Sequence, residues 1–168
     1  GFCFGVKRAM QMASDELDDK STQVYSLGPL IHNKQAVNKY EEKGLKVVEE
    51  IENIPSNERV IIRSHGVGEN IYNEAETKSV KIVDTTCPFV KKIHKIVNDF
   101  SKKGYKIIII GNKTHPEVIG INGWCGNNAI VIKSIDEIDN IEFDKDAKYC
   151  VVSQTTVDID NYEKIVEK

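Results

Sequence analysis

The sequence has no hydrophobic run that approaches the roughly 20 residues of a membrane-spanning helix. The stretch from Gly1 to Lys20 also differs from a signal peptide, because charged side chains such as Lys7, Arg8 and Asp15 interrupt it. Neither charge dominates: the formal net charge is -3 at pH 7 and the sequence pI is ≈ 5.9, whereas a dedicated nucleic-acid binder usually has a basic face. We therefore expect a cytoplasmic protein that binds neither membranes nor nucleic acids.

Closely paired cysteines are missing too. The sequence has four cysteines and no C-x-x-C pair among them: Cys3, Cys87, Cys125 and Cys150. In a reducing compartment such widely spaced cysteines are rarely disulfides, so they are either buried core thiols or ligands that the fold brings together. The spacing alone does not choose between these roles.

Two common phosphate-binding motifs are absent. The sequence has no G-x-G-x-x-G and no G-x-x-x-x-G-K-[ST], so ordinary dinucleotide and nucleoside-triphosphate sites lack support. It also has no initiator methionine and stops inside an apparent helix from Asp158 to Lys168. We expect the chain to be a fragment of a longer protein.

What is present is a composition suited to a folded core. The chain has 168 residues, with 40% hydrophobic and 29% charged side chains, as in soluble globular proteins. Short β-branched runs alternate with amphipathic stretches, a pattern typical of α/β units with parallel strands. We predict strands at residues 23–27, 46–48, 59–63, 80–84, 106–110, 129–132 and 148–152. We predict helices at residues 6–17, 33–43, 69–78, 88–103, 116–124 and 159–166.

Local features support these elements. The run Ile107–Ile110 has no polar alternation, as expected of a strand covered by helices on both faces. Pro88 suits a first helical position, and Gly44 and Gly104 suit the left-handed residue that ends a helix. A soft boundary near Cys87 favours two small parallel-sheet α/β domains, residues 1–87 and 88–168, over one continuous sheet.

The reactive side chains share one kind of position. Three histidines lie just after a predicted strand and just before a predicted helix: His32, His65 and His115. Cys87 lies in the same kind of turn, and Cys3 directly precedes a helix. Open α/β sheets bind ligands at the carboxyl ends of their strands, where helix N-termini attract anions and favour thiolates. Three imidazoles meeting there would make an anion site.

Other cysteines and one histidine have structural interpretations. His94 lies inside a predicted helix, where a structural or surface role is expected. Cys150 lies within a strand and reflects core packing, and Cys125, next to Trp124, is expected to be a packed thiol.

Two further polar residues allow two interpretations each. Glu117 follows His115 by two positions, so it is either a favourable first-turn carboxylate or a proton donor inside an anion pocket. Thr155 follows the last predicted strand, and without other information a helix cap is the stronger interpretation.

Six segments together resemble one known family, the hydroxymethylbutenyl diphosphate reductases, also called LytB or IspH. The segments occur in the family's order: Gly1–Val6, Ile31-His32-Asn33, Ser64-His65-Gly66-Val67, Asp84-Thr85-Thr86-Cys87-Pro88, Thr114-His115-Pro116-Glu117-Val118 and Ser153-Gln154-Thr155-Thr156. Any one of them is unspecific, but six in order are highly specific.

The resemblance implies a three-domain α/β fold around an iron–sulfur cluster (4Fe-4S), of which this chain supplies the first two domains. It implies that Cys3 and Cys87 are two of the three cysteine ligands of the cluster. The third cysteine, together with Ser and Asn residues of the diphosphate site, belongs to the third domain. Cys125 and Cys150 do not match that ligand. We therefore expect the isolated chain to be inactive.

The resemblance also implies the substrate site and the reaction. The residues that bind the substrate diphosphate are His32, His65 and His115. Glu117 delivers a proton, and Thr155 belongs to the polar network at the substrate hydroxyl. The enzyme reductively removes that hydroxyl, giving isopentenyl and dimethylallyl diphosphates for isoprenoid synthesis. Because no flavin or nicotinamide motif is visible, electrons come from a ferredoxin or flavodoxin.

Two other classes of function stay open on the residues alone. The chain could be a non-catalytic module that binds a phosphorylated metabolite through its histidine turns. It could also be a structural zinc domain that uses Cys3, Cys87 and a histidine. Iron with acid-labile sulfide would favour the reductase, zinc the structural domain, and no metal the simple binder.

Overall fold

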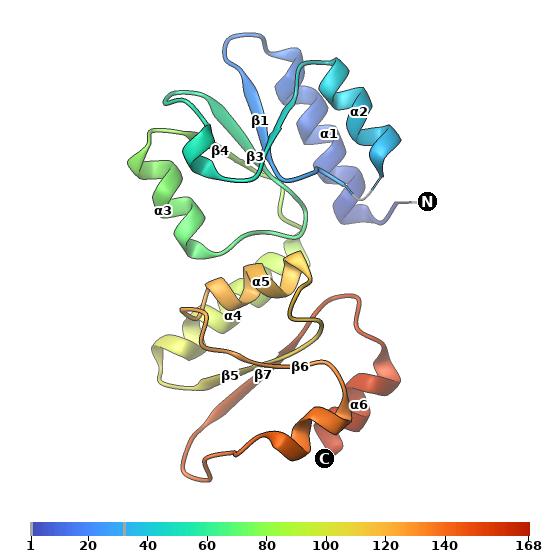
Figure 1. The fold of residues 1–168 in the computed structure, drawn as a ribbon, viewed down its shortest axis with the longest axis vertical. Coiled ribbons are helices and arrows are strands. Elements are labelled where there is room, and N and C mark those ends of the chain that lie inside the picture. The colour runs from blue at the N-terminus through green and yellow to red at the C-terminus, as the bar shows by residue number, and fades with distance from the viewer. Residues whose placement is uncertain (1, 32) are drawn as a thin grey trace. The chain divides into compact units, whose positions relative to one another are not determined.

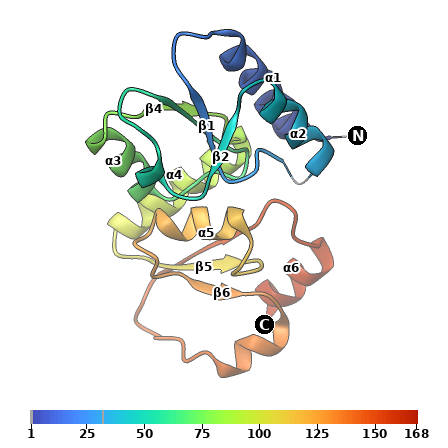
Figure 2. The same cartoon turned by 45° about the horizontal axis from the view of Figure 1, so that its top comes forward.

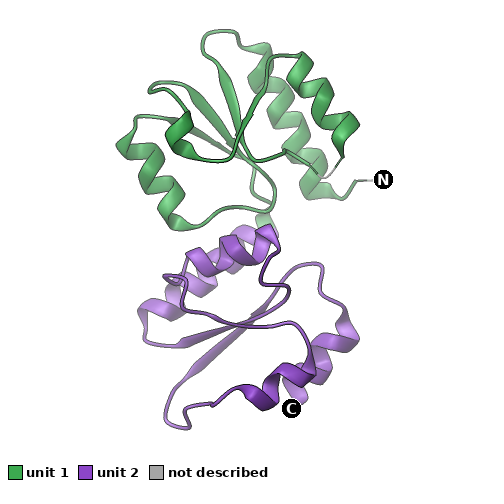
Figure 3. Ribbon diagram, viewed as in Figure 1, with its two compact units in different colours: residues 1–88 green, residues 89–168 purple. Residues whose placement is uncertain are grey.

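The computed structural model describes residues 2–31 and 33–168, which form two compact units. Unit 1 is Gly1–Pro88 and unit 2 is Phe89–Lys168 (Figure 3). The predicted domains, 1–87 and 88–168, divide one residue earlier, and we keep them as a proposal. No helix in the part of the chain that the structure describes is long and apolar enough to cross a membrane.

Unit 1 is a parallel four-stranded sheet in the order β2-β1-β3-β4 (Figure 1). Its strands are β1 (Val24–Leu27), β2 (Lys46–Val48), β3 (Arg59–Ile62) and β4 (Lys81–Asp84). Its helices are α1 (Phe4–Asp18), α2 (Lys34–Glu42), α3 (Glu69–Thr77) and the short 3-10 helix η1 (Ile51–Asn53).

Both faces of this sheet are covered. On one face, Leu17 of α1 belongs to the same core cluster as Ile61 of β3. On the other face, Ala75 of α3 and Ile51 of η1 belong to the same cluster as Ile62. Because neighbouring residues of a strand point to opposite faces, β1 and β3 are buried along their whole length.

Unit 2 is a parallel three-stranded sheet in the order β6-β5-β7. Its strands are β5 (Lys106–Ile110), β6 (Ile130–Ile132) and β7 (Tyr149–Ser153). Its helices are α4 (Pro88–Lys102), α5 (Pro116–Gly123), α6 (Ile159–Glu167) and the 3-10 helix η2 (Ile135–Asn140).

The run of isoleucines in β5 is divided between two cores. Ile107 and Ile109 pack with residues of α4 and α5, such as Val97. Ile108 and Ile110 pack on the opposite face with residues of α6 and η2. Figure 2 shows α5 on one side of β5 and α6 on the other. The prediction of a strand covered on both faces is therefore confirmed.

The predicted elements all occur, with ends shifted by at most two residues. Helix α4 begins at Pro88 as predicted, and Gly44 and Gly104 have positive φ values of 106° and 81° after their helices. The sequence did not indicate η1 and η2, because a helix of one or two turns has too few residues for a periodic pattern.

Candidate functional site

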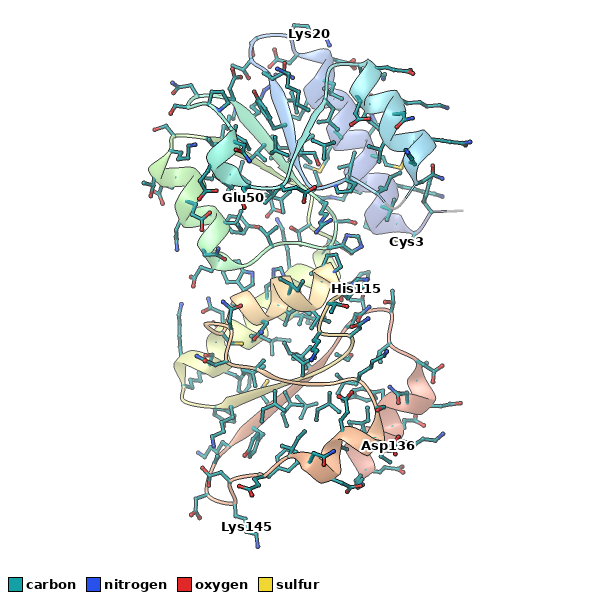
Figure 4. The ribbon with its side chains drawn as sticks, in the orientation of Figure 1. Cys3, Lys20, Glu50, His115, Asp136 and Lys145 are labelled. Carbon is teal, nitrogen blue, oxygen red and sulfur yellow. The ribbon has the colours of Figure 1, made fainter. Side chains whose placement is uncertain are left out.

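Two cysteines of unit 1 lie on neighbouring segments. Cys3 is exposed and is the N-cap residue of α1, while Cys87 is half-buried and directly precedes α4. A Cβ atom added to Gly5 would lie 2.8 Å from Cys87 Sγ, so this sulfur packs against the first turn of α1. Figure 4 shows Cys3 at the start of that helix. The fold thus brings together two segments that are 84 positions apart in the sequence (87 minus 3).

Backbone and side-chain contacts fix the turn that carries Cys87. The Cys87 N–H donates a hydrogen bond to the Ser64 carbonyl at 2.9 Å. Arg8, one turn along α1 from Cys3, places its Nη1 at 3.5 Å from the Thr85 carbonyl oxygen and 3.4 Å from that of Thr86. A cation between two carbonyls links α1 electrostatically to the residues that immediately precede the sulfur.

A half-buried tyrosine and an aspartate support the same turn from another side. The Thr86 N–H donates to Asp84 Oδ1 at 2.9 Å, and the Tyr72 hydroxyl donates to Asp84 Oδ2 at 3.1 Å. Burial, and then the Asp84 carboxylate, raise the pKa of Tyr72, so the phenol stays a neutral donor. Sequence analysis missed Tyr72, because nothing in the sequence indicates a partner twelve positions away.

His65 lies in a tight turn next to these residues. The Gly66 N–H donates to the Arg63 carbonyl at 3.0 Å, which closes the turn around His65, and Gly66 has a positive φ of 72°. The Ser64 carbonyl of this turn is the acceptor for Cys87 N–H, so the histidine and the cysteine belong to one hydrogen-bonded edge of unit 1. His32 lies outside the described residues.

In unit 2, His115 is the N-cap residue of α5. Its Nδ1 accepts a hydrogen bond from the Glu117 N–H at 3.1 Å. Because Nδ1 is an acceptor, the proton of the neutral imidazole lies on Nε2, which is then a donor. Figure 4 shows His115 at the opposite end of unit 2 from Lys145, which precedes β7. His115 therefore lies at the carboxyl edge of the sheet, as predicted.

Glu117 is buried, with 2% of its surface exposed. Its Oε1 accepts from the Thr155 N–H at 2.6 Å and its Oε2 from the Thr155 hydroxyl at 2.8 Å. The carboxylate therefore joins α5 to the end of β7. The prediction that Thr155 caps a helix is wrong, since Asp158 caps α6 by accepting from Asn161 N–H at 3.0 Å.

Gln154, also buried, fixes the loop before His115. Its Oε1 accepts from the Asn112 N–H at 3.2 Å, and its Nε2 donates to the Thr156 hydroxyl at 2.8 Å. Gly111 allows this packing, because a Cβ there would lie 2.9 Å from Gln154 Cβ. The sequence motif contained Gln154, but its partners became evident only in the structure.

The structural interpretations of the remaining residues are confirmed. His94 is 4% exposed, and its ring stacks on Trp124 with centroids 5.4 Å apart. Cys125 and Cys150 are buried in the core of unit 2, and burial raises the pKa of both thiols. A raised pKa favours the thiol over the thiolate, which is the form that binds metals.

Cys3 and Cys87 are the thiols that could hold a metal cofactor. Thiolates at helix N-termini are the donors that iron–sulfur clusters use, so the chemistry of this pair fits such a group. Within residues 2–31 and 33–168, no group of three or more His, Cys, Asp or Glu side chains is arranged to hold a metal ion. The prediction that the three histidines share one cavity stays a prediction. His65 belongs to unit 1 and His115 to unit 2, and His32 lies outside the described residues.

The sequence profile of the LytB protein family matches residues 1–168, the whole chain. The chain belongs to the LytB family. A relative from Clostridioides difficile (strain 630), named 4-hydroxy-3-methylbut-2-enyl diphosphate reductase, is 63% identical over 168 residues, which is 100% of this chain and 60% of the relative. One of the same name from Caldanaerobacter subterraneus is 50% identical over 170 residues, covering 99% of this chain and 58% of the relative.

Solved structures of reductases resemble this LytB chain as well. The E-1-hydroxy-2-methyl-but-2-enyl-4-diphosphate reductase from Plasmodium falciparum gives a TM-score of 0.93 at 31% identity, over 99% of this chain and 52% of that one. A structure of (E)-4-hydroxy-3-methyl-but-2-enyl diphosphate reductase, the terminal enzyme of the non-mevalonate pathway, gives a TM-score of 0.85 at 36% identity. The match covers 99% of this chain and 59% of that one. The LytB chain thus spans between 52% and 60% of the length of these four relatives.

Proposed function

We propose that this LytB chain forms the first two domains of a three-domain 4-hydroxy-3-methylbut-2-enyl diphosphate reductase. The reaction is a two-electron, two-proton removal of the substrate hydroxyl as water, giving isopentenyl and dimethylallyl diphosphates for isoprenoid synthesis. The names of its relatives support the substrate and the reaction class. The further residues needed for turnover belong to the remaining part of the full-length protein, so the isolated chain is inactive.

The observation that carries this proposal is the packing of Cys87 Sγ on Gly5, two residues from Cys3. Two cysteine thiolates are donors that both an iron–sulfur cluster and a zinc site use, and no third ligand joins them among the described side chains, so the family of the chain favours the cluster. Cys3 and Cys87 would hold the cluster. When bound, it supplies electrons and an iron that acts as a Lewis acid on the substrate hydroxyl.

The histidines hold the substrate diphosphate. His65 and His115 each lie in a turn between a strand and a helix, where backbone N–H groups and the helix dipole favour anions. In His115 the bond from Glu117 N–H to Nδ1 directs the donor Nε2 away from the helix backbone. His32, which matches the same family motif, completes the set. Holding the diphosphate keeps the allylic carbon in one place for reaction.

Glu117 and Thr155 deliver the proton that lets hydroxide depart as water. Because Glu117 is buried, its proton passes through the Thr155 hydroxyl, which is hydrogen-bonded to Oε2 at 2.8 Å. The Thr155 N–H fixes the other carboxylate oxygen, so the pair has one geometry. The electrons come from a ferredoxin or a flavodoxin, and the enzyme acts in the cytoplasm.

The test uses the full-length protein that contains this chain, purified and loaded with iron and sulfide without oxygen. With a chemical reductant, we expect it to convert the hydroxymethylbutenyl diphosphate to the two products, measured by mass spectrometry. The 168-residue chain, treated identically, should form no product. A loaded full-length protein with iron and labile sulfide but no conversion would refute the proposal, and zinc in place of iron would favour a structural domain.

A further inference from the structure

Arg63 lies at the carboxyl edge of the unit 1 sheet, directly after β3. Its guanidinium lies over Gly28, which directly follows the neighbouring parallel strand β1: a Cβ added to Gly28 would be 3.0 Å from Arg63 Nη1. Gly28 has a positive φ of 70°, so both its backbone and its missing side chain make room for the guanidinium. This edge is where open α/β sheets bind ligands.

One donor of this guanidinium, its buried Nε, has no acceptor among the described residues. Burial, which opposes the charge, lowers the pKa of Arg63, while the carboxylate of Glu49 after β2 favours the charged form. A buried N–H of a charged group without an acceptor is costly, so this Nε needs an acceptor that the described residues do not supply.

Arg59, at the opposite end of the same strand, shows what a structural arginine looks like here. It donates to Glu16 and Asp19 carboxylates at 2.8 and 3.2 Å and to the Thr22 hydroxyl at 2.7 Å. Arg59 begins β3 and Arg63 directly follows it, yet only Arg59 forms hydrogen-bonded ion pairs with carboxylates among the described residues. Hydrogen bonds and ion pairs within the fold therefore account for Arg59, whereas Arg63 Nε has no partner among the described residues.

We propose that Arg63 is a further substrate-binding residue, which binds a phosphate group of the diphosphate beside His65. This inference rests on the proposed function, since it names one more contact for the same substrate. Arg63 and His65 belong to the turn closed by the bond from Gly66 N–H to the Arg63 carbonyl. A guanidinium donates two parallel hydrogen bonds to phosphate oxygens, which an imidazole cannot do.

Inorganic pyrophosphate is the probe. Binding to the 168-residue chain is measured by calorimetry and by the shift of the melting midpoint, with sulfate at equal ionic strength as the comparison. We expect pyrophosphate to stabilise the wild type, and R63M to lose about tenfold or more in affinity. R63K keeps the charge but cannot donate two parallel hydrogen bonds, so its pyrophosphate affinity should lie between those of wild type and R63M. Without anion, R63M should melt at or above the wild-type midpoint, whereas R59M should melt roughly 5 °C or more lower.

Equal pyrophosphate affinity of wild type and R63M, or no specific binding by the wild type, would overturn the role of Arg63. A melting midpoint of R63M as low as that of R59M would assign it a structural role instead. In the full-length reductase, R63M should raise KM for the diphosphate substrate more than it lowers kcat. A full-length protein without any turnover refutes the proposed function and leaves the pyrophosphate result to judge Arg63 separately.

Discussion

At the scale of the residue, the buried pair of Glu117 and Thr155 is the most specific chemical feature of unit 2. Replacing Glu117 with Gln keeps the shape, and the Thr155 hydroxyl can turn to accept from the new amide while its N–H still donates to the amide oxygen. We expect E117Q to fold normally, to keep its cluster, and to lose about 100-fold or more of its turnover in the full-length protein, because an amide delivers no proton. Steady-state kinetics with iron analysis measure both, and normal turnover would exclude Glu117 from the mechanism.

The matched control is E117A. Without the carboxylate, the N–H and hydroxyl of Thr155 lose their acceptor, so E117A should lower the free energy of unfolding by about 1–3 kcal/mol. Chemical denaturation of the 168-residue chain measures this difference between the two variants. Equal stability of E117A and E117Q would show that the pair adds nothing to the fold.

Sequence reasoning located these residues but not their environment. The position of Glu117 in the first turn of a helix follows from Pro116 and the strand before it. Its burial and its bond to Thr155, 38 positions away, depend on how β7 pairs with β5, which local patterns do not contain. The same reason made the capping interpretation of Thr155 wrong, because the nearer Asp158 was the stronger cap.

At the scale of the element, α1 is placed by the absence of a side chain at Gly5. In a helix, Ala is ordinarily better than Gly by about 1 kcal/mol, yet the new Cβ would lie 2.8 Å from Cys87 Sγ. We expect G5A to lower the melting midpoint and to reduce iron binding by the full-length protein. K7A, an exposed change in the same first turn, should alter neither. A G5A variant as stable and as rich in iron as wild type would contradict the packing of Cys87 on α1.

Elements with strong periodicity were predictable, and short ones were not. The continuous run of isoleucines predicted β5, and the amphipathic spacing that follows Pro88 predicted α4. The helix η1 was not predicted, although its Ile51 is fully buried, because three residues are too few to show a hydrophobic periodicity. The contact of Arg8 with the Thr85 and Thr86 carbonyls was equally invisible, since it joins segments more than 70 positions apart.

At the scale of the whole molecule, the four cysteines divide into an accessible pair and a buried pair. Cys3 is exposed and Cys87 half-buried, whereas Cys125 and Cys150 are buried with raised pKa values. Under native conditions we expect iodoacetamide to modify the accessible pair at least about tenfold faster, because the buried thiols react only after local opening. Peptide mass spectrometry follows each site, and full denaturant should make all four rates similar. Equal native rates would contradict the burial of the second pair.

The central claim is that Cys3 and Cys87 together hold the cluster. The decisive measurement is the iron and acid-labile sulfide content of full-length cysteine variants after reconstitution without oxygen. We predict about four irons per protein for wild type and for the matched controls C125S and C150S, and loss of most of this iron in C3S and in C87S. Full iron content in C3S or C87S would contradict the account.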